Sequence, residues 1–417
     1  MNAPLAPYAL FAGMLAMAGL PIYIHAPDFY FTEFGLSLTA MAGVLGALRI
    51  LDFAQDPALG WLSRRLSAVR GKAVLVAVVV MALAMFGLFA VTPPIAPIAW
   101  FAITLALLFS AFSFLTISFY SEGVSKAKGL DGDGHIKLAG WRETGSLLGV
   151  CVAAVAPVAL LTVTESPFLL FTVAFAALCA VAAYAMRREW KGADAQIEIG
   201  LKPILSDPMA RRLLLIALLN ATPVAVTSVL FVFFVESRLE AQDWEGALLL
   251  LFFLAAAGAA PVWSRLAQRY GPKPTLMFGM VLAIATFSWA ATLGAGDIAA
   301  FAVICIFSGA ALGADMTLLP ALFASRMSEI APEAAEGFGL WSFVSKFSLA
   351  FAAIVLLPLL DAAGFTAGAT NQPEEALNAL TLSYAVLPCG LKIAALLLLW
   401  VTPIEAHGGT ALNRGLQ

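Results

Sequence analysis

The chain alternates between long apolar stretches and short breaks rich in polar residues, glycine and proline. Each apolar stretch has about 20 residues, the length at which an α-helix crosses the hydrocarbon core of a bilayer. Polar and Gly/Pro positions mark where these stretches end. The pattern predicts twelve membrane-spanning helices, at Tyr8–Phe31, Leu38–Leu62, Ala73–Val91, Ile98–Ser121, Leu138–Leu161, Pro167–Met186, Leu213–Val235, Trp244–Ser264, Thr275–Leu293, Ile298–Leu322, Gly337–Leu360 and Leu377–Thr402.

The composition of the chain makes lipid its main solvent. Of the 417 residues, 62% are hydrophobic and 12% are charged, whereas a soluble domain has about 25% charged residues. The mean hydropathy is +0.93. Twelve spans with short loops account for the length, so we predict an all-α membrane protein without a separate soluble domain.

No sequence motif of an enzyme or a cofactor site accompanies this pattern. The chain lacks a phosphate-binding Walker loop, a Gly-x-Ser-x-Gly nucleophile elbow and a His-rich metal pattern. Its four cysteines stand singly in apolar segments, without the spacing of a metal or redox site. We therefore predict a protein that is not an enzyme and that has no cofactor.

The longest polar segment, residues 187–212, divides the chain nearly in half. We predict a first six-helix bundle at residues 1–190, a cytoplasmic linker at 191–211, a second six-helix bundle at 212–403 and a cytoplasmic tail at 404–417. A short basic motif after the second helix recurs 200 positions later, after the second helix of the other half. This weak repeat is typical of two parallel halves around a central substrate path.

The basic residues predict which side of the membrane each loop faces. Eighteen of the 23 lysines and arginines lie in alternate loops or in the tail, and the opposite loops hold only Arg238. Cytoplasmic loops are enriched in basic residues, so these loops and both termini are predicted to be cytoplasmic in a multi-pass inner-membrane protein. Because the basic residues are sorted by side rather than gathered in a patch, we expect no nucleic acid among the partners.

Charged residues inside the predicted spans indicate the functional interior, because a charge within the bilayer is costly unless it is paired or hydrated. Arg49, Asp52 and Asp56 follow i, i+3, i+7 spacing on the second helix and form one polar stripe. The positions opposite the two acids in the second half are apolar, so the pair is not an architectural repeat. One interpretation is a buried ion network neutralised by Arg49, and the interpretation we favour is a cation or proton route.

Depth along the helices indicates which charged residues meet. At about 1.5 Å per residue, Asp52 and Lys346 lie about 15 Å from the cytoplasmic ends of their helices, near the bilayer midplane. They belong to opposite halves, and we expect them to meet across the interface. Asp56, Thr116 and Arg142 lie within about 10 Å of the cytoplasmic face and are expected to form a second layer.

Four further residues have weaker claims. Trp141 and Trp341, each close in sequence to an intramembrane cation, either stack on a solute or anchor their helices at the membrane interface. Asp315 is expected to brace a neighbouring basic loop rather than to bind solute. Lys392 lies late in the chain and is not given a role.

The run Arg49–Gly60, RILDFAQDPALG in one-letter code, resembles the helix-two signature of the glycoside-pentoside-hexuronide:cation symporters, the melibiose-carrier family of the major facilitator superfamily. The similarity extends upstream through Phe29–Ser37 and downstream to the regions of Arg142 and Lys346. This resemblance implies a major facilitator fold, with twelve transmembrane helices in two six-helix halves that work by alternating access.

The resemblance also implies roles for individual residues. In that family the two helix-two acids bind the coupling cation and the helix-eleven lysine lies nearby, which carries over to Asp52, Asp56 and Lys346. The family has a helix-five arginine near its sugar site, and Arg142 matches it.

Two positions depart from the family pattern. Thr116 replaces the helix-four acid, so one cation ligand is a hydroxyl rather than a carboxylate, which weakens the case for sodium. The helix-one acid that holds the galactoside aligns with Met17, which argues against a melibiose-like solute. The wider family also resembles lysophospholipid carriers, and a less polar first helix suits an amphiphile.

The sequence thus favours a Na⁺- or H⁺-coupled symporter of a small organic solute such as a sugar or glycoside. A lysophospholipid or other amphiphile carrier is the alternative within transport, and a non-transporting membrane receptor or scaffold is the alternative from another class. We expect a monomer whose partners are its solute and membrane lipid. The cation-coupling candidates, with the two acids as ligands if the ion is Na⁺, are Asp52, Asp56, Thr116 and Lys346; the substrate-binding candidates are Arg142, Trp141, Arg49, Trp341 and Tyr120.

Overall fold

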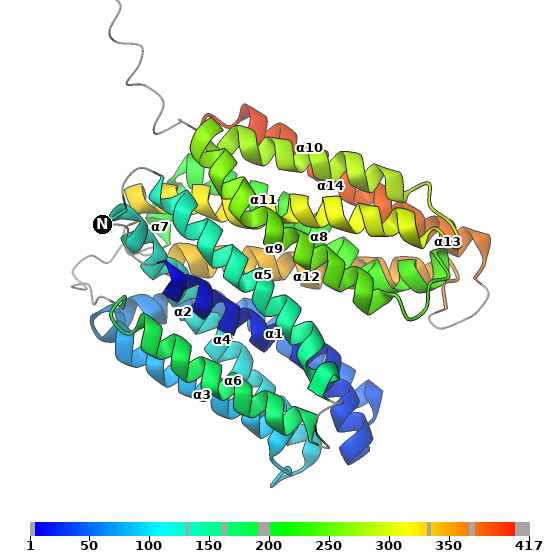
Figure 1. The fold of residues 1–417 in the computed structure, drawn as a ribbon, viewed down its shortest axis with the longest axis horizontal. Coiled ribbons are helices and arrows are strands. Elements are labelled where there is room, and N and C mark those ends of the chain that lie inside the picture. Colours follow the sequence, from blue (N-terminus) through cyan, green and yellow to red (C-terminus); the bar gives the residue numbers. More distant parts are fainter. Residues whose placement is uncertain are drawn as a thin grey trace, which may run out of the picture.

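The computed structural model describes residues 5–130, 133–160, 164, 166–190, 201–331, 335–366 and 372–404. Within these ranges every element of regular secondary structure is a helix (Figure 1). The first half contains α1 (Ala6–Phe34), α2 (Leu38–Arg65), η1 (Ser67–Val69), α3 (Arg70–Ala90), α4 (Pro97–Lys128), α5 (Gly134–Leu160) and α6 (Pro167–Met186). The second half contains α7 (Lys202–Ser206), α8 (Pro208–Phe233), η2 (Phe234–Arg238), α9 (Glu245–Tyr270), α10 (Pro272–Ala290), α11 (Ile298–Ile330), α12 (Ala335–Ala362), α13 (Glu374–Thr381), η3 (Leu382–Val386) and α14 (Leu387–Val401).

The helices follow the predicted spans in order and differ from them mainly at their ends. α4 and α11 continue past the predicted ends at Ser121 and Leu322. In α4 the added residues are polar and still pack, since Glu122 and Lys126 form ion pairs of 2.7 and 2.6 Å within the bundle. The last span is divided, because a π-helical turn, η3, separates α13 from α14 just before Pro388, which has no backbone N–H to donate.

Nine helical segments in the described part of the chain are long and apolar enough to cross a membrane. α2 and α5 are not among them, and these two helices carry the interior charges of the first half. α1 contributes a shorter apolar helix over Ala6–Gly19. The structure is therefore that of a multi-pass membrane protein, and the count of twelve crossings stays a prediction.

The long helices form two bundles, α1–α6 and α8–α14, that lie side by side (Figure 1). One hydrophobic core consists of buried residues from the first bundle alone, and another of residues from the second alone. A third core joins the bundles, with Ile117 and Ile136 from the first and Phe323 and Phe338 from the second. In Figure 1 the two bundles approach each other at the end that carries the N-terminus and diverge toward the other end.

The end of the molecule at which α1 begins gathers basic loops of the first bundle, and we call it the basic end. The phenol of Tyr8 and the ammonium group of Lys126 both donate to Glu189, at 3.4 and 2.6 Å. These contacts place the start of α1, the end of α4 and the segment after α6 together. The sequence predicts that this end faces the cytoplasm.

The two bundles are held together near the basic end. Arg64 Nε on α2 donates to Glu336 Oε1 on α12 at 2.8 Å. Ser264 Oγ on α9 donates to the backbone oxygen of Ile136 on α5 at 3.1 Å. Both contacts join helices of different halves, so any motion that opens the halves at this end must break them.

The predicted linker contains a helix where it is described. Residues 191–200 of the linker and residues 405–417 of the predicted tail lie outside the described residues. After residue 200, α7 forms, and α8 begins at Pro208 with Asp207 as its N-cap, whose carboxylate accepts a hydrogen bond from the N–H of Ala210 at 2.7 Å. The first helix of the second bundle begins before residue 212 because aspartate at the N-cap and proline at the first position favour a helix start.

Candidate transport site

A cavity of about 480 Å³ lies between the two bundles, and we call it the central cavity. Its walls come from α4 and α5 of the first bundle and from α8, α9, α11 and α12 of the second. Apolar side chains form more than half of the lining. The polar and charged lining residues are Thr116, Tyr120, Glu143, Asn220, Ser228, Asp315, Ser342, Ser345 and Lys346.

Lys346 of the second half contacts two carboxylates of the first half. Its Nζ donates to Asp52 Oδ1 at 2.7 Å and to Asp56 Oδ1 at 3.1 Å. It also donates to Ser113 Oγ at 2.5 Å, and Ser113 Oγ donates to Asp52 Oδ1 at 3.1 Å. We call these four residues the Lys346 cluster. Asp52 and Asp56 are 5% and 0% exposed, so two buried carboxylates share one ammonium group, an arrangement that favours a further cation.

Helix geometry and two glycines bring the Lys346 cluster together. Asp52 and Asp56 are four residues apart on α2, so they project from the same face. α2 and α12 approach closely, because a Cβ on Gly339 would lie 2.7 Å from the carbonyl oxygen of Asp56, and one on Gly60 would lie 3.0 Å from a backbone oxygen of α12. This close approach lets the side chain of Lys346 reach α2.

A second charged group lies in the first bundle beside the central cavity. Arg142 Nε donates to Glu143 Oε1 at 2.8 Å, and the phenol of Tyr120 donates to the same oxygen at 3.0 Å. The guanidinium carbon of Arg142 lies 3.7 Å from the centroid of the Tyr120 ring, a cation–π contact. Tyr120 and Glu143 line the cavity, whereas Arg142 lies behind them. Arg142 therefore influences the cavity by holding Tyr120 and Glu143 in position.

Two more sequence candidates line the central cavity. Thr116 lies one turn from Ser113 on α4, and its buried Oγ1 has no hydrogen-bond partner among the described residues. Trp341 on α12 faces the cavity, and its ring centroid lies 4.9 Å from that of Phe323. An unpaired hydroxyl and an aromatic face are groups that a bound ion or solute can contact.

Trp141 and Arg49 lie away from the central cavity. Trp141 is 51% exposed and faces a separate groove between α1, α5 and α9. At about 100° per residue, Trp141 and Glu143 point to nearly opposite sides of α5, and Glu143 is the one that lines the central cavity. Arg49 is half-buried, one turn before Asp52, and is not among the described residues that line the cavity. The structure therefore places neither candidate where it would contact a solute in this cavity.

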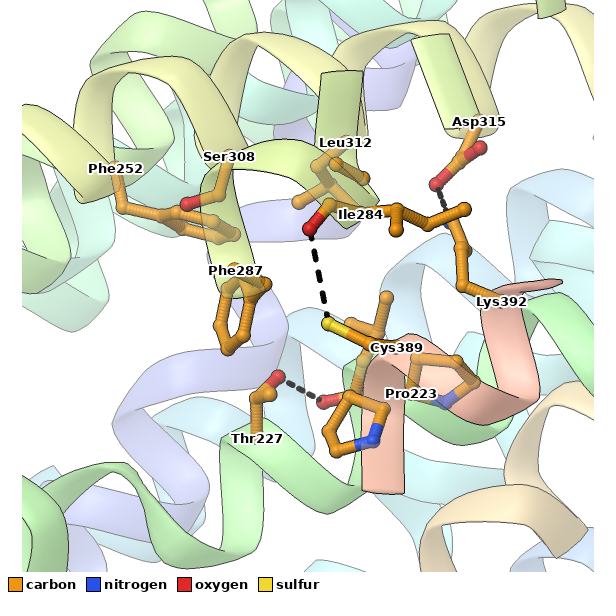
Figure 2. A pocket seen from close by; sticks show the side chains of 13 residues that line it. Pro223, Thr227, Phe252, Ile284, Phe287, Ser308, Leu312, Asp315, Cys389 and Lys392 are labelled. Carbon is orange, nitrogen blue, oxygen red and sulfur yellow. Dashed lines mark hydrogen bonds and ion pairs between the residues drawn. The ribbon is translucent and has the colours of Figure 1, made fainter. Parts of the chain in front are cut away.

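One buried ion pair escapes sequence reasoning. Asp315 Oδ2 on α11 accepts a hydrogen bond from Lys392 Nζ on α14, and both residues are buried (Figure 2). The expectation that Asp315 braces a basic loop is wrong, because its partner is an intramembrane lysine. This pair could have been found from the sequence, because Asp315 and Lys392 carry opposite charges in apolar spans of the same half, where each charge needs a partner.

Ser113 is a second residue that the sequence did not single out. It lies three positions before Thr116 on α4 and therefore on the same helix face, which is the signal that could have found it. Its hydroxyl adds an oxygen to the two carboxylates of the Lys346 cluster.

Two helical bundles around a central cavity, with intramembrane charges between them, define a secondary transporter of the major facilitator type. The model of the MFS/sugar transport protein family matches residues 7–406, and the chain belongs to this family. The match confirms the resemblance to major facilitator transporters and places the chain among transporters rather than enzymes. No curated protein matches the sequence of this chain.

Solved structures share the fold over nearly the whole chain. A bacterial homologue of the iron transporter ferroportin, in an outward-facing state, has a TM-score of 0.69 and 15% identity, over 94% of this chain and 99% of that one. The E. coli fucose:proton symporter has a TM-score of 0.68 and 15% identity, over 94% and 98% of the two chains. These likenesses confirm the predicted major facilitator fold.

Proposed function

We propose that the protein is a cation-coupled symporter that moves a small organic solute, such as a sugar or glycoside, across the inner membrane by alternating access, with Na⁺ or H⁺ as the coupling ion. The observation that carries this proposal is the contact of Lys346 with Asp52 and Asp56, because it joins the two halves beside the central cavity. Membership of the MFS/sugar transport protein family supports a sugar-like solute. The fold shared with a fucose:proton symporter is consistent with cation coupling.

The Lys346 cluster links cation binding to the arrangement of the halves. Without a bound cation, Lys346 neutralises the carboxylates of the other half and holds α12 to α2. A cation that enters the cluster is coordinated by oxygens of Asp52, Asp56 and Ser113, with the hydroxyl of Thr116 one turn along α4. Lys346 then loses its partners, so the free-energy difference between the two conformations of the carrier changes.

The solute occupies the central cavity next to the Lys346 cluster. Tyr120 and Glu143 present polar groups to it, and Arg142 fixes their positions. Trp341 presents an aromatic face on which a sugar ring can stack. Solute and cation therefore bind at neighbouring sites that involve both halves, as coupled transport requires.

A second candidate function is suggested by the apolar part of the cavity lining. Ile117, Phe253 and Leu319 are among the apolar residues that face the central cavity, and such a surface also accommodates an acyl chain. A lysophospholipid or other amphiphile carrier has this combination of an apolar wall and a charged group. Lipid retained by the delipidated protein, with no stabilisation by sugars, would favour this function.

Uptake into proteoliposomes tests the proposal. A panel of radiolabelled sugars and glycosides is offered with an inward Na⁺ gradient, with an inward pH gradient and with neither. We expect concentrative uptake under one of the gradients and simple equilibration without it. Uptake of lysolipid alone would favour the amphiphile carrier, and no uptake of any candidate would favour a receptor or scaffold; either result contradicts the sugar symporter.

A further inference from the structure

Two residues of the second bundle that line the central cavity each have a buried side-chain oxygen with no hydrogen-bond partner among the described residues. These oxygens are Oδ1 of Asp315 on α11 and Oδ1 of Asn220 on α8, and the two residues are 7% and 4% exposed. Buried polar groups in proteins are almost always hydrogen-bonded, so an unpaired acceptor on a residue that lines a cavity is a group that a bound hydroxyl can contact.

The Asp315 carboxylate is held in place by Lys392, which does not line the central cavity. Lys392 donates to Asp315 Oδ2, which leaves Oδ1 as the buried oxygen without a partner among the described residues. Figure 2 shows this ion pair at the edge of a smaller cavity whose wall includes Phe252 and Phe287. That cavity has a volume of about 60 Å³, against about 480 Å³ for the central cavity. Asp315 also lines the central cavity, so a solute reaches its carboxylate from there.

The ion pair of Asp315 and Lys392 is suited to binding rather than to switching. Both residues belong to the second bundle, so a rigid-body movement of one bundle against the other leaves their contact intact. The other ionisable groups that face Asp315 across the two cavities are Lys346 on α12, Glu143 on α5, Tyr120 on α4 and Cys389 on α14. The lining residues of α8, α9 and α10 carry no ionisable side chain.

We propose that Asp315 and Asn220 form a hydroxyl-binding subsite in the second bundle, in which their side-chain oxygens accept hydrogen bonds from O–H groups of a polyhydroxylated solute. Lys392 is a positioning residue that holds the Asp315 carboxylate. This subsite rests on the proposed function, because it lies in the same central cavity, and it names the solute class: a sugar or polyol with at least two free hydroxyl groups. The solute is then held between the first bundle and this subsite.

Sugar binding to the purified protein in nanodiscs, measured without any ion gradient, tests the subsite. The probes are a panel of aldopentoses, aldohexoses and their methyl glycosides, followed by monodeoxy analogues of the sugar that binds tightest. Asn220→Leu removes one acceptor and leaves no unpaired charge. The double variant Asp315→Asn/Lys392→Gln removes the charged acceptor together with its partner, so that no buried charge is left alone.

We expect Asn220→Leu to weaken sugar binding about three- to tenfold and the double variant about ten- to a hundredfold. Lys392→Arg keeps the cation beside Asp315 and should retain most of the affinity. Thr317→Val is the matched control: the buried hydroxyl of Thr317 on α11 also has no partner among the described residues, but Thr317 does not line either cavity, so the variant should bind sugar like the wild type. The monodeoxy analogue that lacks the hydroxyl bound by Asp315 should bind the wild type and the double variant alike.

Three results would overturn the subsite. The first is unchanged sugar affinity in both variants, and the second is that the double variant lowers the affinity for every deoxy analogue as much as it lowers the affinity for the parent sugar. The third is binding of lysophosphatidylcholine with no binding of any sugar. These outcomes are separate from a failure of cation coupling, because the binding measurement uses no gradient. A protein that binds sugar through Asn220 but accumulates none would keep the subsite and refute the symporter. If Asn220→Leu and the double variant both accumulate sugar with normal affinity, the symporter is kept and the subsite is refuted.

Discussion

Among the described residues, two of the intramembrane ion-pair groups differ in whether they cross between the halves. In the Lys346 cluster, the lysine comes from the second half and both carboxylates come from the first. Asp315 and Lys392 both belong to the second half. A rocking movement changes the geometry of the first group and leaves that of the second unchanged.

This difference separates two uses of buried charge. An ion pair between two moving bodies responds to conformation, and by linkage a cation that competes for it changes the conformational balance. An ion pair within one body presents a fixed carboxylate to whatever enters the cavity. Substitutions in the Lys346 cluster should therefore affect coupling, and substitutions around Asp315 should affect affinity.

The largest expected effect is loss of coupling in Asp52→Asn and in Asp56→Asn. Each variant removes one of the two carboxylates that would bind the cation, so uptake should stop when the solute concentrations inside and outside are equal. Solute exchange should persist, because the central cavity is intact. The double variant Asp315→Asn/Lys392→Gln is the control for these two variants, and at saturating solute it should still accumulate the solute. Wild-type accumulation ratios in either single variant would refute the assignment.

The next effect is on stability, and it should be larger for the pair within one half. Lys392→Ala leaves the Asp315 carboxylate buried and unpaired, which costs about 3–5 kcal/mol. Asp315→Leu/Lys392→Leu removes both charges and should recover most of the loss. When the coupling cation is present, Lys346→Ala should lose less, because the cation can take the place of the lysine. Thermal unfolding of the three purified variants, with and without Na⁺, measures these differences. An equal loss of stability in Lys346→Ala and Lys392→Ala would contradict the distinction.

A smaller effect is expected from the contact between Arg64 and Glu336, which crosses the halves at the basic end. A partly exposed pair contributes about 0.2–1 kcal/mol, so Arg64→Gln should shift the population toward the conformation open at this end by about 1.4- to fivefold. Lys126→Gln is the matched control, since the ion pair of Lys126 with Glu189 has similar exposure but lies within the first half. Accessibility of single cysteines placed at the basic end measures the shift. Equal accessibility in Arg64→Gln and the wild type would count against this contact as a latch.

The smallest effect concerns an ion pair outside the predicted spans. Arg326 donates to Asp207 at 3.0 Å and lowers the pKa of this carboxyl below its usual value. Because the folded-state pKa is lowered, the stabilisation is present above the unfolded pKa, about 3.9, and is lost as the pH falls through the folded pKa. Asp207→Asn should lower the thermal-unfolding temperature slightly at neutral pH and flatten its dependence on pH below about 4. Unchanged acid sensitivity in this variant would contradict the linkage.

Much of this fold could be predicted from the sequence, because a bilayer imposes a simple rule on helix length and polarity. The order of the spans and the meeting of Asp52 with Lys346 followed from apolar runs and from depth along the helices. The extension of α4 past Ser121 could not be predicted, because its charged residues are typical of a loop in the sequence although they form ion pairs within the bundle.

The candidate site was less predictable, because depth along a helix says nothing about direction around it. Trp141 and Arg142 have nearly the same depth, yet Trp141 faces an outer groove. The partner of Asp315 could not be identified either, since this requires knowing that the side chain of Lys392 on α14 reaches α11, although α12 and α13 intervene in the chain.

The central claim is that Lys346 and the coupling cation compete for the same two carboxylates, Asp52 and Asp56. Calorimetric titration of the purified Lys346→Ala variant with Na⁺ at constant pH, paired with proton-uptake titration, tests this claim most directly. We predict that the variant binds the coupling cation at least as tightly as the wild type, because the internal competitor is gone. It should still fail to accumulate solute, because the empty carrier cannot neutralise its acids and return. Collapse of cation affinity in this variant, with accumulation preserved, would contradict the account.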